Sequence, residues 1–534
     1  MLTMHNVLNM TEDKQPDIAE PVIKEQHTNN RRVAKNTMML YVRMIVMTLI
    51  ALYTSRKVLQ VLGVSDYGVF NAVGGVVTMF SVLSSSLSTA VSRYLTFELG
   101  RGDKNRLKAV FSTSLNVQFT IAVLIVLLGA VAGGWFLNAK MNIPMARMDA
   151  ANWVLYCSLF AFALNLVSVP YTASIVSHER MNVFAYMSIL EATLKLSVVF
   201  LLFWSPYDKL KTYAVLLLVV AIVIRYIYAV YCKRSFEECT YHFIHDVPLL
   251  KEMTQFAGWN FFGNAAWIFN NQGINILINI FFGVTLNAAR GIASQVEALV
   301  MQFVNNFMTA LNPQITKTYA VGDLNNMHQL VCRGAKFSFF LMMFFAIPFC
   351  FETHRILSLW LGVVPDYAVA FVRLTFLASM CTLLGNTLVT AQLATGKIKK
   401  YQIVMTLVGV WVFPLTWLAY KLGGDAIWAY IIFCIIYFAL IFVRIYLVKD
   451  LIKLSWKQYV KEVLVKSAVV GLIAIVPPLL VYILMPPTML RFIVLLLVSV
   501  IASILTIYWV GMNKTERASI MNLINDKLNI KIKS

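Results

Sequence analysis

The sequence predicts an all-α integral membrane protein of about fourteen transmembrane helices, built as two pseudo-symmetric six-helix lobes followed by two extra C-terminal helices. Three observations lead to this fold class. The 534-residue chain is 59% hydrophobic and only 13% charged, and its mean hydropathy is +0.72. Apolar runs of about twenty residues recur along its whole length. Short motifs also return at a constant spacing, which indicates a duplicated unit.

Fourteen segments are long and apolar enough to cross a bilayer as helices. The expected spans are 37–62, 67–92, 107–137, 153–177, 183–204, 212–232, 255–283, 288–312, 335–351, 369–393, 401–420, 426–447, 467–485 and 490–510. They divide the chain into an N-terminal tail (1–36), an N-lobe (37–232), an interlobe linker (233–254), a C-lobe (255–447), a C-terminal helix pair (448–511) and a C-terminal tail (512–534).

Basic residues are unequally shared between the two sets of connections. One set, which includes both tails, 93–108, 397–400 and 449–466, carries about 28 Lys and Arg, and the other carries about 10. Because basic connections stay on the cytoplasmic side, we expect both termini and the interlobe linker in the cytoplasm. The first apolar run follows a polar, mixed-charge tail, so we expect no cleavable signal peptide.

The duplication is visible in two motifs. LGVS at 62–65 returns as FGVT at 282–285, and the Gly-Asp pair at 102–103 returns at 322–323, both 220 residues further along. The members of each pair lie at equivalent places, after the first and seventh spans and after the second and eighth. Because six spans separate the equivalents, the two lobes have the same orientation in the membrane.

The seventh span, 255–283, carries no charge but contains a stripe of asparagine. The stripe comprises Asn260, Asn264, Asn271, Asn275 and, slightly further round the helix, Asn279. The first four lie within about 60° of one another on a helical wheel. An amide facing lipid leaves hydrogen-bonding groups unpaired, so the stripe must face protein or water. Two interpretations are open: interhelical hydrogen bonds, or the wall of a hydrated cavity, along which Gly258, Gly263 and Gly273 would let the helix bend.

Charged residues inside the spans are the other candidates for a site, because a buried charge is costly in a membrane. In the first span, Arg43 and Lys57 share one face, and Arg56 lies beside Lys57 on another face. Snorkelling toward the headgroups explains either end of this row separately. Two cations on one stripe instead indicate a face turned toward a cavity.

Two further groups of charged and polar residues complete the candidates. In the fifth span, Glu191 and Lys195 stand four residues apart, which predicts an ion pair that is either structural or coupled to a proton or another cation. In the eighth span, Arg290, Gln295 and Glu297 could meet a cation or a substrate hydroxyl.

The sequence excludes several function classes. It has no nucleotide-binding loop, metalloprotease motif or nucleophile elbow, so we expect no catalytic residue. The seven cysteines lack metal-ligand spacing and the histidines lack ligand partners, so we expect neither a metal nor another cofactor apart from H⁺ or Na⁺ coupling. The net charge of +20 is spread between apolar segments, which favours membrane lipids over nucleic acid as a partner.

Several stretches together resemble one family. They are NNRRVAKNTMMLYVRM at 29–44, the stretch beginning TSRKVLQVLGVSDYGVF at 54, ALNPQITKTYAVGD at 310–323 and ILSLWLGVVPDY at 356–367. They are similar to the bacterial polysaccharide-biosynthesis flippases of the Wzx type, which serve O-antigen, capsule or exopolysaccharide synthesis. Those flippases belong to the multidrug/oligosaccharidyl-lipid/polysaccharide exporter superfamily.

The resemblance implies a central cavity between the lobes that opens alternately to each side of the bacterial inner membrane. It implies transfer of an undecaprenyl-diphosphate-linked oligosaccharide from the cytoplasmic to the periplasmic leaflet. It also implies a cationic cavity, for which Arg43, Arg56 and Lys57 are the candidates here, and partners among glycan assembly and polymerase proteins. A cavity with cations for the phosphates and amides for the sugars would replace the water that such a headgroup loses.

Two alternative functions are weighed against this one. A cation-coupled drug or metabolite antiporter of the same superfamily would favour an acidic ion site, but the first span has basic residues and neither Asp nor Glu. A membrane-embedded polysaccharide polymerase or ligase would need a sizeable periplasmic loop, and the longest expected ones, around 138–152 and 352–368, are short.

Overall fold

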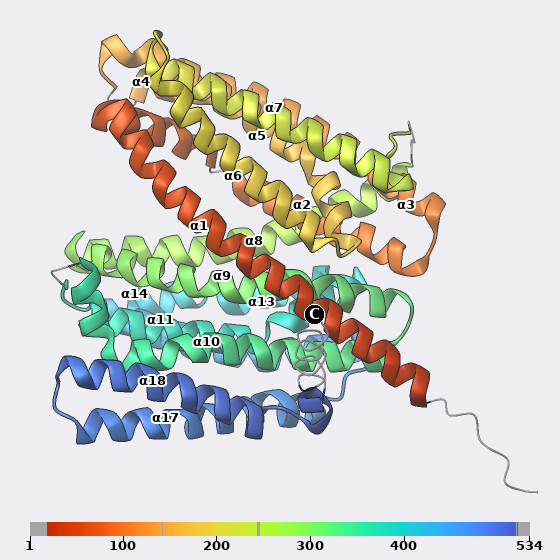
Figure 1. Cartoon of the computed structure of the whole chain (residues 1–534), viewed down its shortest axis with the longest axis vertical. Coiled ribbons are helices and arrows are strands. Elements are labelled where there is room, and N and C mark those ends of the chain that lie inside the picture. The colour runs from red at the N-terminus through yellow and green to blue at the C-terminus, as the bar shows by residue number, and fades with distance from the viewer. Residues whose placement is uncertain are drawn as a thin grey trace, which may run out of the picture.

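The computed structural model describes residues 19–78, 80–140, 143–242, 246–282, 284–361, 364–518 and 521, and at some helical positions, Arg56 and Asn279 among them, it describes the backbone alone. Across these residues the secondary structure is helical and contains no β-strand (Figure 1). The all-α class is confirmed.

The first half of the chain forms the N-lobe. Its helices are α1 (Ala19–Thr78), α2 (Ser81–Arg101), α3 (Lys104–Leu128), α4 (Gly134–Lys140), α5 (Met148–Ser177), α6 (Met181–Phe203) and α7 (Lys209–Ser235), with short turns η1 (Gly129–Gly133), η2 (Met145–Arg147) and η3 (Glu237–Cys239). A sharp bend divides α1 at Gly63, whose φ of 78° is a conformation that glycine adopts without strain. The first expected span is therefore the part of α1 before the bend, and the second continues from the rest of α1 into α2.

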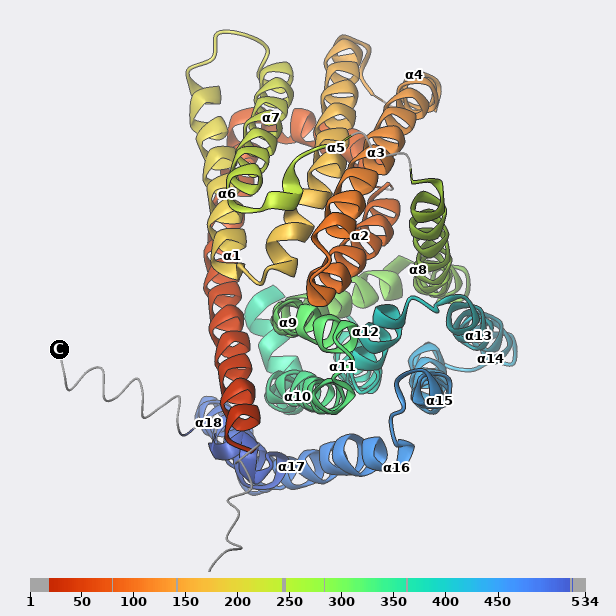
Figure 2. The same cartoon turned by 90° about the vertical axis from the view of Figure 1, so that its right-hand side faces the viewer.

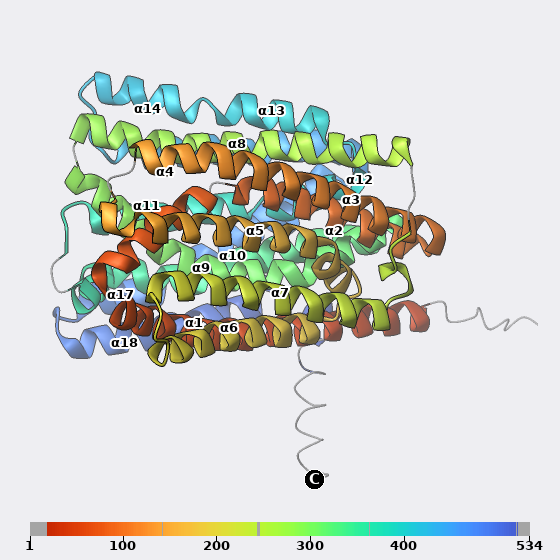
Figure 3. The ribbon, with the colours of Figure 1, turned by 90° about the horizontal axis from the view of Figure 1, so that it is seen from above.

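The second half forms the C-lobe and the C-terminal pair. Its helices are α8 (Val247–Phe282), α9 (Val284–Ala320), α10 (Leu324–Leu361), α11 (Ala368–Leu383), α12 (Asn386–Thr395), α13 (Lys399–Gly409), α14 (Val412–Lys421), α15 (Trp428–Ile452), α16 (Trp456–Tyr459), η4 (Val460–Val465), α17 (Lys466–Leu484), α18 (Met489–Thr506) and η5 (Ile507–Gly511). Figure 3 shows that the long helices of both lobes run in one general direction.

The Gly-Asp repeat forms the same helix-to-helix turn in both lobes. Gly102 after α2 and Gly322 after α9 both have left-handed φ angles, 75° and 81°. The aspartate that follows each glycine caps the next helix: Asp103 accepts the Arg106 N–H at 3.0 Å, and Asp323 accepts the Asn326 N–H at 3.1 Å. The repeated residues therefore occupy equivalent structural positions, as the duplication predicts.

Each lobe has its own hydrophobic core. One core gathers buried residues from Val58 to Cys239 and extends to the start of α8, as far as Ala257, and to Ile398. Another gathers residues from Ala289 to Ala474, and a smaller one joins α8 to α14 and α15. The lobes meet where α2 packs against both α8 and α9, and α1 lies along α6 and α9 (Figure 2). The α17–α18 pair packs against α10 on the outside of the C-lobe (Figure 1).

Eleven helical segments of the described chain are long and apolar enough to cross a membrane. The segments that contain α2, α8 and α9 are not among them, because their serine, asparagine and charged residues lower the hydropathy. These are also the helices at which the lobes meet. A multi-pass membrane protein is supported, and the exact count of fourteen spans stays a prediction.

Several helices continue past the apolar runs from which the spans and domains are predicted, and the domain boundaries stay a prediction. Helix α1 already begins at Ala19, inside the expected N-terminal tail. Helix α7 ends at Ser235 and α8 begins at Val247, so the connection between the lobes is shorter than 233–254. Hydropathy marks the part of a helix that lies in lipid, whereas backbone hydrogen bonding continues into water.

Candidate functional site

A cavity of about 420 Å³ lies between the lobes, and we call it the interlobe cavity. Helices α2, α5 and α6 of the N-lobe and α9 and α12 of the C-lobe form its walls. Its polar lining consists of Ser88, Thr89, Ser92, Arg93, Thr96, Thr172, Thr309, Asn312, Thr316 and Thr390. Most of these residues are hydroxyl-bearing, and the lining contains one cation and no acidic side chain.

The hydroxyl groups of the interlobe cavity offer acceptor oxygens. Thr89, Thr309 and Thr316 each donate their hydroxyl hydrogen to the backbone carbonyl four residues earlier in their helix. A hydroxyl used in this way keeps lone pairs for a donor in the cavity. Asn312 accepts a hydrogen bond from Thr390 at 2.9 Å through its Oδ1 atom. This lining is suited to a ligand rich in hydroxyl groups.

Arg93 is the cation of the interlobe cavity. Its guanidinium lies over the rings of Tyr94 and Phe97, at 4.4 and 4.7 Å from the centroids. Its Nη2 donates to the Ala394 carbonyl of α12 at 3.0 Å, whereas its buried Nε has no hydrogen-bond partner among the described residues. The sequence analysis placed Arg93 at the start of a cytoplasmic connection. In the structure α2 continues as a helix to Arg101, so Arg93 lies within a helix, and its position relative to the membrane stays a prediction.

An ion cluster joins the lobes beside this cavity, at the end of the molecule that carries the basic connections. Its centre is Glu179, between α5 and α6, whose side chain is only 2% exposed. The carboxylate accepts Lys317 Nζ at 2.7 Å and Gln314 Nε2 at 3.1 Å, both from α9. From α1, Arg32 lies 3.6 Å from the carboxylate and Asn36 donates to the Glu179 carbonyl at 3.2 Å. We call these five residues the Glu179 cluster.

A second polar cavity, of about 260 Å³, lies inside the C-lobe, and we call it the C-lobe cavity. It brings together three residues singled out from the sequence: Asn271, Arg290 and Glu297. Arg290 donates to the Asn271 carbonyl at 3.2 Å, and Ser379 of α11 donates its hydroxyl hydrogen to Glu297. The third residue predicted on this span, Gln295, is exposed and lies outside that lining.

Arg444 of α15 also lines the C-lobe cavity. Its buried Nε has no hydrogen-bond partner in the described part of the chain. The guanidinium lies so close to α12 that a Cβ atom at Gly385 would stand 2.8 Å from its Nη1 atom. Arg444 thus points into the lobe, and tertiary packing decided its direction.

The asparagine stripe of α8 divides into two parts. Asn260 and Asn264 donate to the backbone oxygen and the hydroxyl of Ser86 in α2, at 3.4 and 2.9 Å, so they bond the lobes together. Asn271 lines the C-lobe cavity, and Asn275 donates to Gln272 at 3.0 Å. The side chain of Asn279 lies outside the described residues. Hydrogen bonds between helices thus use the first two asparagines, and the wall of a hydrated cavity stays a prediction for the rest of the stripe.

The glycines of α8 allow close packing. Helix α8 is continuous from Val247 to Phe282 and does not break at them. A Cβ atom at Gly263 would stand 2.1 Å from Gln402 of α13, and one at Gly273 would stand 2.6 Å from Phe413 of α14. These two glycines make room for neighbouring side chains, and bending of the helix at them stays a prediction.

Neither Arg43 nor Lys57 of α1 is among the lining residues of the two cavities, although Arg43 packs on Phe184, which lines the interlobe cavity. Arg43 lies 4.6 Å from the Phe184 ring centroid of α6, and Lys57 lies 5.8 Å from the ring of Tyr53 on its own helix. The side chain of Arg56 lies outside the described residues. A role for these three residues in binding substrate stays a prediction.

The fifth span contains the ion pair that its spacing suggests. Lys195 Nζ lies 2.6 Å from Glu191 Oε1 on α6, and both side chains are partly exposed. Coupling of this pair to a proton or another cation stays a prediction. Across the described residues, no group of three His, Cys, Asp or Glu side chains could hold a metal ion.

The sequence analysis missed the residues of the interlobe cavity. The signal that could have found them is the run SSSLSTAVS at 84–92, which places six hydroxyl groups in nine residues of an expected membrane span. Such a density of hydroxyl groups is unusual for a lipid-facing helix. The polar partner residues on α9 and α12 are isolated threonines and one asparagine, without a comparable signal.

Comparison with known families gives one match that covers more than half of the chain. Residues 33–319 match the family described as polysaccharide biosynthesis protein. A curated relative, the uncharacterized membrane protein EpsK of Bacillus subtilis (strain 168), is 19% identical over 307 residues. That match covers 57% of this chain and only 60% of the length of EpsK.

Solved structures share the fold. A structure titled as a mutant of a MATE protein is 13% identical and superposes with a TM-score of 0.69, over 80% of this chain and 97% of that one. A structure titled as a MOP superfamily transporter from Pyrococcus furiosus, whose title reports a binding pocket of reverse polarity, has a TM-score of 0.66 at 13% identity, over 80% of this chain and 96% of that one. At this level of identity the likeness establishes the fold alone.

Proposed function

The chain belongs to the polysaccharide biosynthesis protein family, and from this premise we propose that it is a lipid-linked oligosaccharide flippase. In this proposal it moves an undecaprenyl-diphosphate-linked glycan unit from the cytoplasmic to the periplasmic leaflet by alternating access. The product would serve the synthesis of a cell-surface polysaccharide such as O-antigen, capsule or exopolysaccharide. The protein would act by transport and without catalysis.

The observation that carries the proposal is the lining of the interlobe cavity, with many hydroxyl groups, one amide and a single, partly buried arginine. Sugar hydroxyls can donate to the threonine and serine oxygens, and the Asn312 amide can donate in return. A diphosphate can accept a charge-assisted hydrogen bond from the guanidinium of Arg93, which lines the cavity. The polyprenyl tail can stay in lipid while the headgroup crosses.

The Glu179 cluster supports alternating access. The cluster forms ionic contacts between α9 and the N-lobe at the basic end of the molecule. We assign this end to the cytoplasmic side. At the opposite end, the ion pair of Arg147 with Asp208 joins elements within one lobe at 2.5 Å. Breaking the cluster would let the lobes separate on the cytoplasmic side without disturbing the opposite end.

The distribution of basic residues supports a place in the bacterial inner membrane with both termini in the cytoplasm. The partners we expect are the lipid-linked oligosaccharide, membrane lipids and proteins that assemble or polymerise the glycan.

Replacing Arg93 tests the function. We expect Arg93→Ala to keep normal abundance in the membrane and to lower export about tenfold or more, because one charge-assisted hydrogen bond is lost. Arg101→Ala is the matched control, since Arg101 is an exposed arginine on the last turn of the same helix. The assay measures lipid-linked oligosaccharide in each leaflet. Normal export by the Arg93 variant would contradict the proposal.

A cation-coupled drug or metabolite antiporter is the second candidate, favoured by the acidic Glu297 inside the C-lobe cavity. In that case vesicles that contain the protein would drive efflux of a cationic dye under a proton or sodium gradient, and Glu297→Gln would abolish the efflux. A wild-type protein that moves glycan lipid and leaves the dye gradient unchanged would exclude this candidate.

A further inference from the structure

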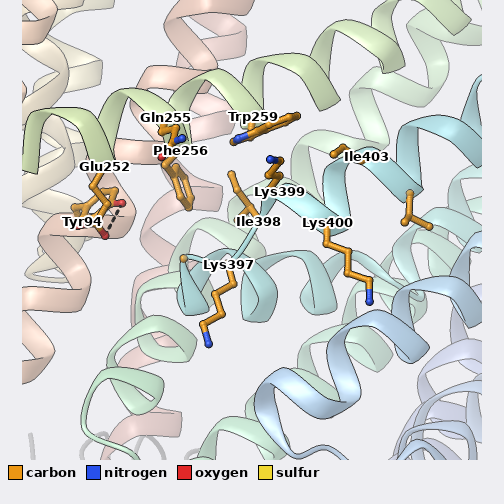
Figure 4. Close-up of a pocket in the computed structure, with 12 residues that line it drawn as sticks. Tyr94, Glu252, Gln255, Phe256, Trp259, Lys397, Ile398, Lys399, Lys400 and Ile403 are labelled. Carbon is orange, nitrogen blue, oxygen red and sulfur yellow. Dashed lines mark hydrogen bonds between the residues drawn. The ribbon is translucent and has the colours of Figure 1, made fainter. Parts of the chain in front are cut away.

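A third cavity, of about 610 Å³, lies at the basic end of the molecule, on the side of α8 and α13 (Figure 4). It is walled by Tyr94 of α2, by Phe256 and Trp259 of α8 and by the connection between α12 and α13. We call it the lysine pocket. Its lining is separate from that of the interlobe cavity and from that of the C-lobe cavity.

Three exposed lysines of one short segment give the lysine pocket its charge. They are Lys397, Lys399 and Lys400, and none of them forms an ion pair within the described residues. Lys399 extends toward Trp259, with its Nζ 5.4 Å from the ring centroid, and the other two extend from the rim (Figure 4). The one acidic lining residue is Glu252, whose carboxylate accepts the Tyr94 hydroxyl at 3.1 Å. The pocket therefore carries an excess of positive charge.

The segment that presents the lysines is held in place at three points. Ile398, between two of the lysines, is 2% exposed and belongs to the hydrophobic core of the N-lobe. Gln392 donates to the Lys397 carbonyl at 3.0 Å. Gly396 has a left-handed φ of 76° and lies against the guanidinium of Arg93. The lysines thus stand on a fixed backbone, so their ordering costs less on binding.

The other walls of the lysine pocket are apolar and lead toward the bilayer. Ile403 and Val404 of α13 line it beside Phe256. Further along the same two packed helices, Leu407 of α13 and Phe262 of α8 are exposed. A ligand that fills this pocket can place an anionic head against the lysines and an acyl or prenyl chain along α8 and α13. A free inorganic anion would leave the apolar part unused.

We propose that the lysine pocket binds the phosphate-bearing headgroup of an anionic lipid from the cytoplasmic leaflet. The chemistry is shared by two sources, a bulk phospholipid such as phosphatidylglycerol and a polyprenyl diphosphate. In both, phosphate oxygens accept from the lysine ammonium groups, while Trp259 lies at the level of the headgroup. The inference does not rest on the cargo proposed above, because a lipid site at this place would serve any transporter with this basic face.

The test compares two triple variants in nanodiscs made of equal parts phosphatidylglycerol and phosphatidylcholine. The first is Lys397→Gln, Lys399→Gln and Lys400→Gln. The matched control is Lys449→Gln, Lys457→Gln and Lys461→Gln, which removes the same charge from the same end of the molecule outside the pocket. Native mass spectrometry measures the phosphatidylglycerol that stays bound. We expect a loss of about fivefold for each pocket lysine removed and little change in the control.

Two further measurements sharpen the test. A photoactivatable phosphatidylglycerol should cross-link to the peptide that contains 396–404 in the wild type and not in the pocket variant. Undecaprenyl diphosphate added as a competitor identifies the source: displacement assigns the site to the polyprenyl lipid, and undisturbed binding assigns it to phospholipid. Equal retention of phosphatidylglycerol by the wild type and the pocket variant, or equal loss in both triple variants, would overturn the proposal.

Discussion

The asparagine side chains of α8 show how one residue type serves two purposes along one helix. Asn260 is 5% exposed and donates across the lobe interface to Ser86, as Asn264 does. Asn271, two to three turns further on, lines a cavity inside the C-lobe. In membrane proteins such amides contribute about 0.6 to 2 kcal/mol each when they bond between helices.

We therefore expect accessibility to differ along the stripe. In a variant whose seven native cysteines are replaced, a cysteine at Asn271 should react with small aqueous thiol reagents at least about tenfold faster than one at Asn260 or Asn264. Labelling rates measured in membranes check this, with the lipid-side position Ile280 as the unreactive control. Equal, fast labelling at Asn264 and Asn271 would contradict the division of the stripe.

Asp208 is a residue whose charge the fold stabilises at the start of α7. Its Oδ1 accepts the N–H groups of Leu210 and Lys211 at 3.0 and 3.1 Å, and its Oδ2 accepts Arg147 at 2.5 Å. Burial raises the pKa of the Asp208 carboxyl, but the Lys211 N–H and the Arg147 guanidinium together lower it below its ordinary value.

This lowered pKa predicts a pH-dependent contribution to stability. A carboxyl whose folded pKa is depressed stabilises the fold above its unfolded pKa, about 3.9, and loses that effect as the pH falls through the folded value. We expect Asp208→Asn to lower the free energy of unfolding by about 1 kcal/mol at pH 7 and by less at pH 3.5. Thermal unfolding in detergent measures both, with Asp149→Asn, an exposed partner of Lys211, as the control. If Asp208→Asn destabilises the protein equally at both pH values, the lowered pKa of Asp208 does not contribute to stability as predicted.

At the scale of elements, the C-terminal pair is fastened to α10 by ion pairs at both ends. Lys336 of α10 lies 3.1 Å from Glu516, and the two side chains are 1% and 4% exposed. Near the other end, Glu352 lies 2.9 Å from Arg491 of α18. The helix pair is thus part of the C-lobe's packing, although the sequence suggested only an appendage.

Removing one partner of the Lys336–Glu516 pair should be costly. Glu516→Ala leaves a buried ammonium without its counter-ion, and we expect a loss of about 3–5 kcal/mol in the free energy of unfolding. The double variant Lys336→Met, Glu516→Met should recover most of this loss, because the fully buried ammonium is gone as well and the volume is retained. Arg333, which also lies 3.3 Å from Glu516, loses its partner but is 18% exposed and can contact water. Glu462→Gln, in a partly exposed pair with Lys466, serves as the control. Thermal unfolding decides: a double variant as unstable as Glu516→Ala would refute this account.

At the scale of the whole molecule, the interlobe contacts are concentrated at the basic end. A Cβ atom at Gly100 of α2 would stand 2.9 Å from Ala320 of α9, so the two helices touch closely there. The Glu179 cluster adds a buried charge network across the same junction. Glu179 itself has a left-handed φ of 57°, which a glutamate adopts only where its surroundings hold it.

We expect Glu179→Gln to weaken this junction and to favour opening toward the cytoplasm. A single cysteine at Ser92, which lines the interlobe cavity, should then be labelled from the cytoplasmic side about tenfold faster in the Glu179→Gln variant than in the protein that keeps Glu179. Labelling of inside-out vesicles measures the change. Glu237→Gln removes an exposed pair with Lys104 and is the matched control. An unchanged rate in the Glu179 variant would show that the cluster does not hold the lobes together.

The sequence by itself determined the all-α membrane class, the duplication and the caps at the Gly-Asp turns. These depend on local composition and on residues a few positions apart, such as Asp103 and the N–H of Arg106. It also marked Asn271, Arg290 and Glu297 as polar residues that must avoid lipid, because the bilayer penalises them wherever they point.

Only the tertiary structure decided where those residues point. Asn264 bonds across the interface while Asn271 faces a cavity, because α2 and its Ser86 reach one end of α8 and the C-lobe helices surround the other. Arg93, which the sequence assigned to a connection, enters the interlobe cavity because α12 ends beside it. A helical wheel gives the direction of a side chain relative to its own helix, whereas contacts between residues 178 or 301 positions apart fix what lies in that direction.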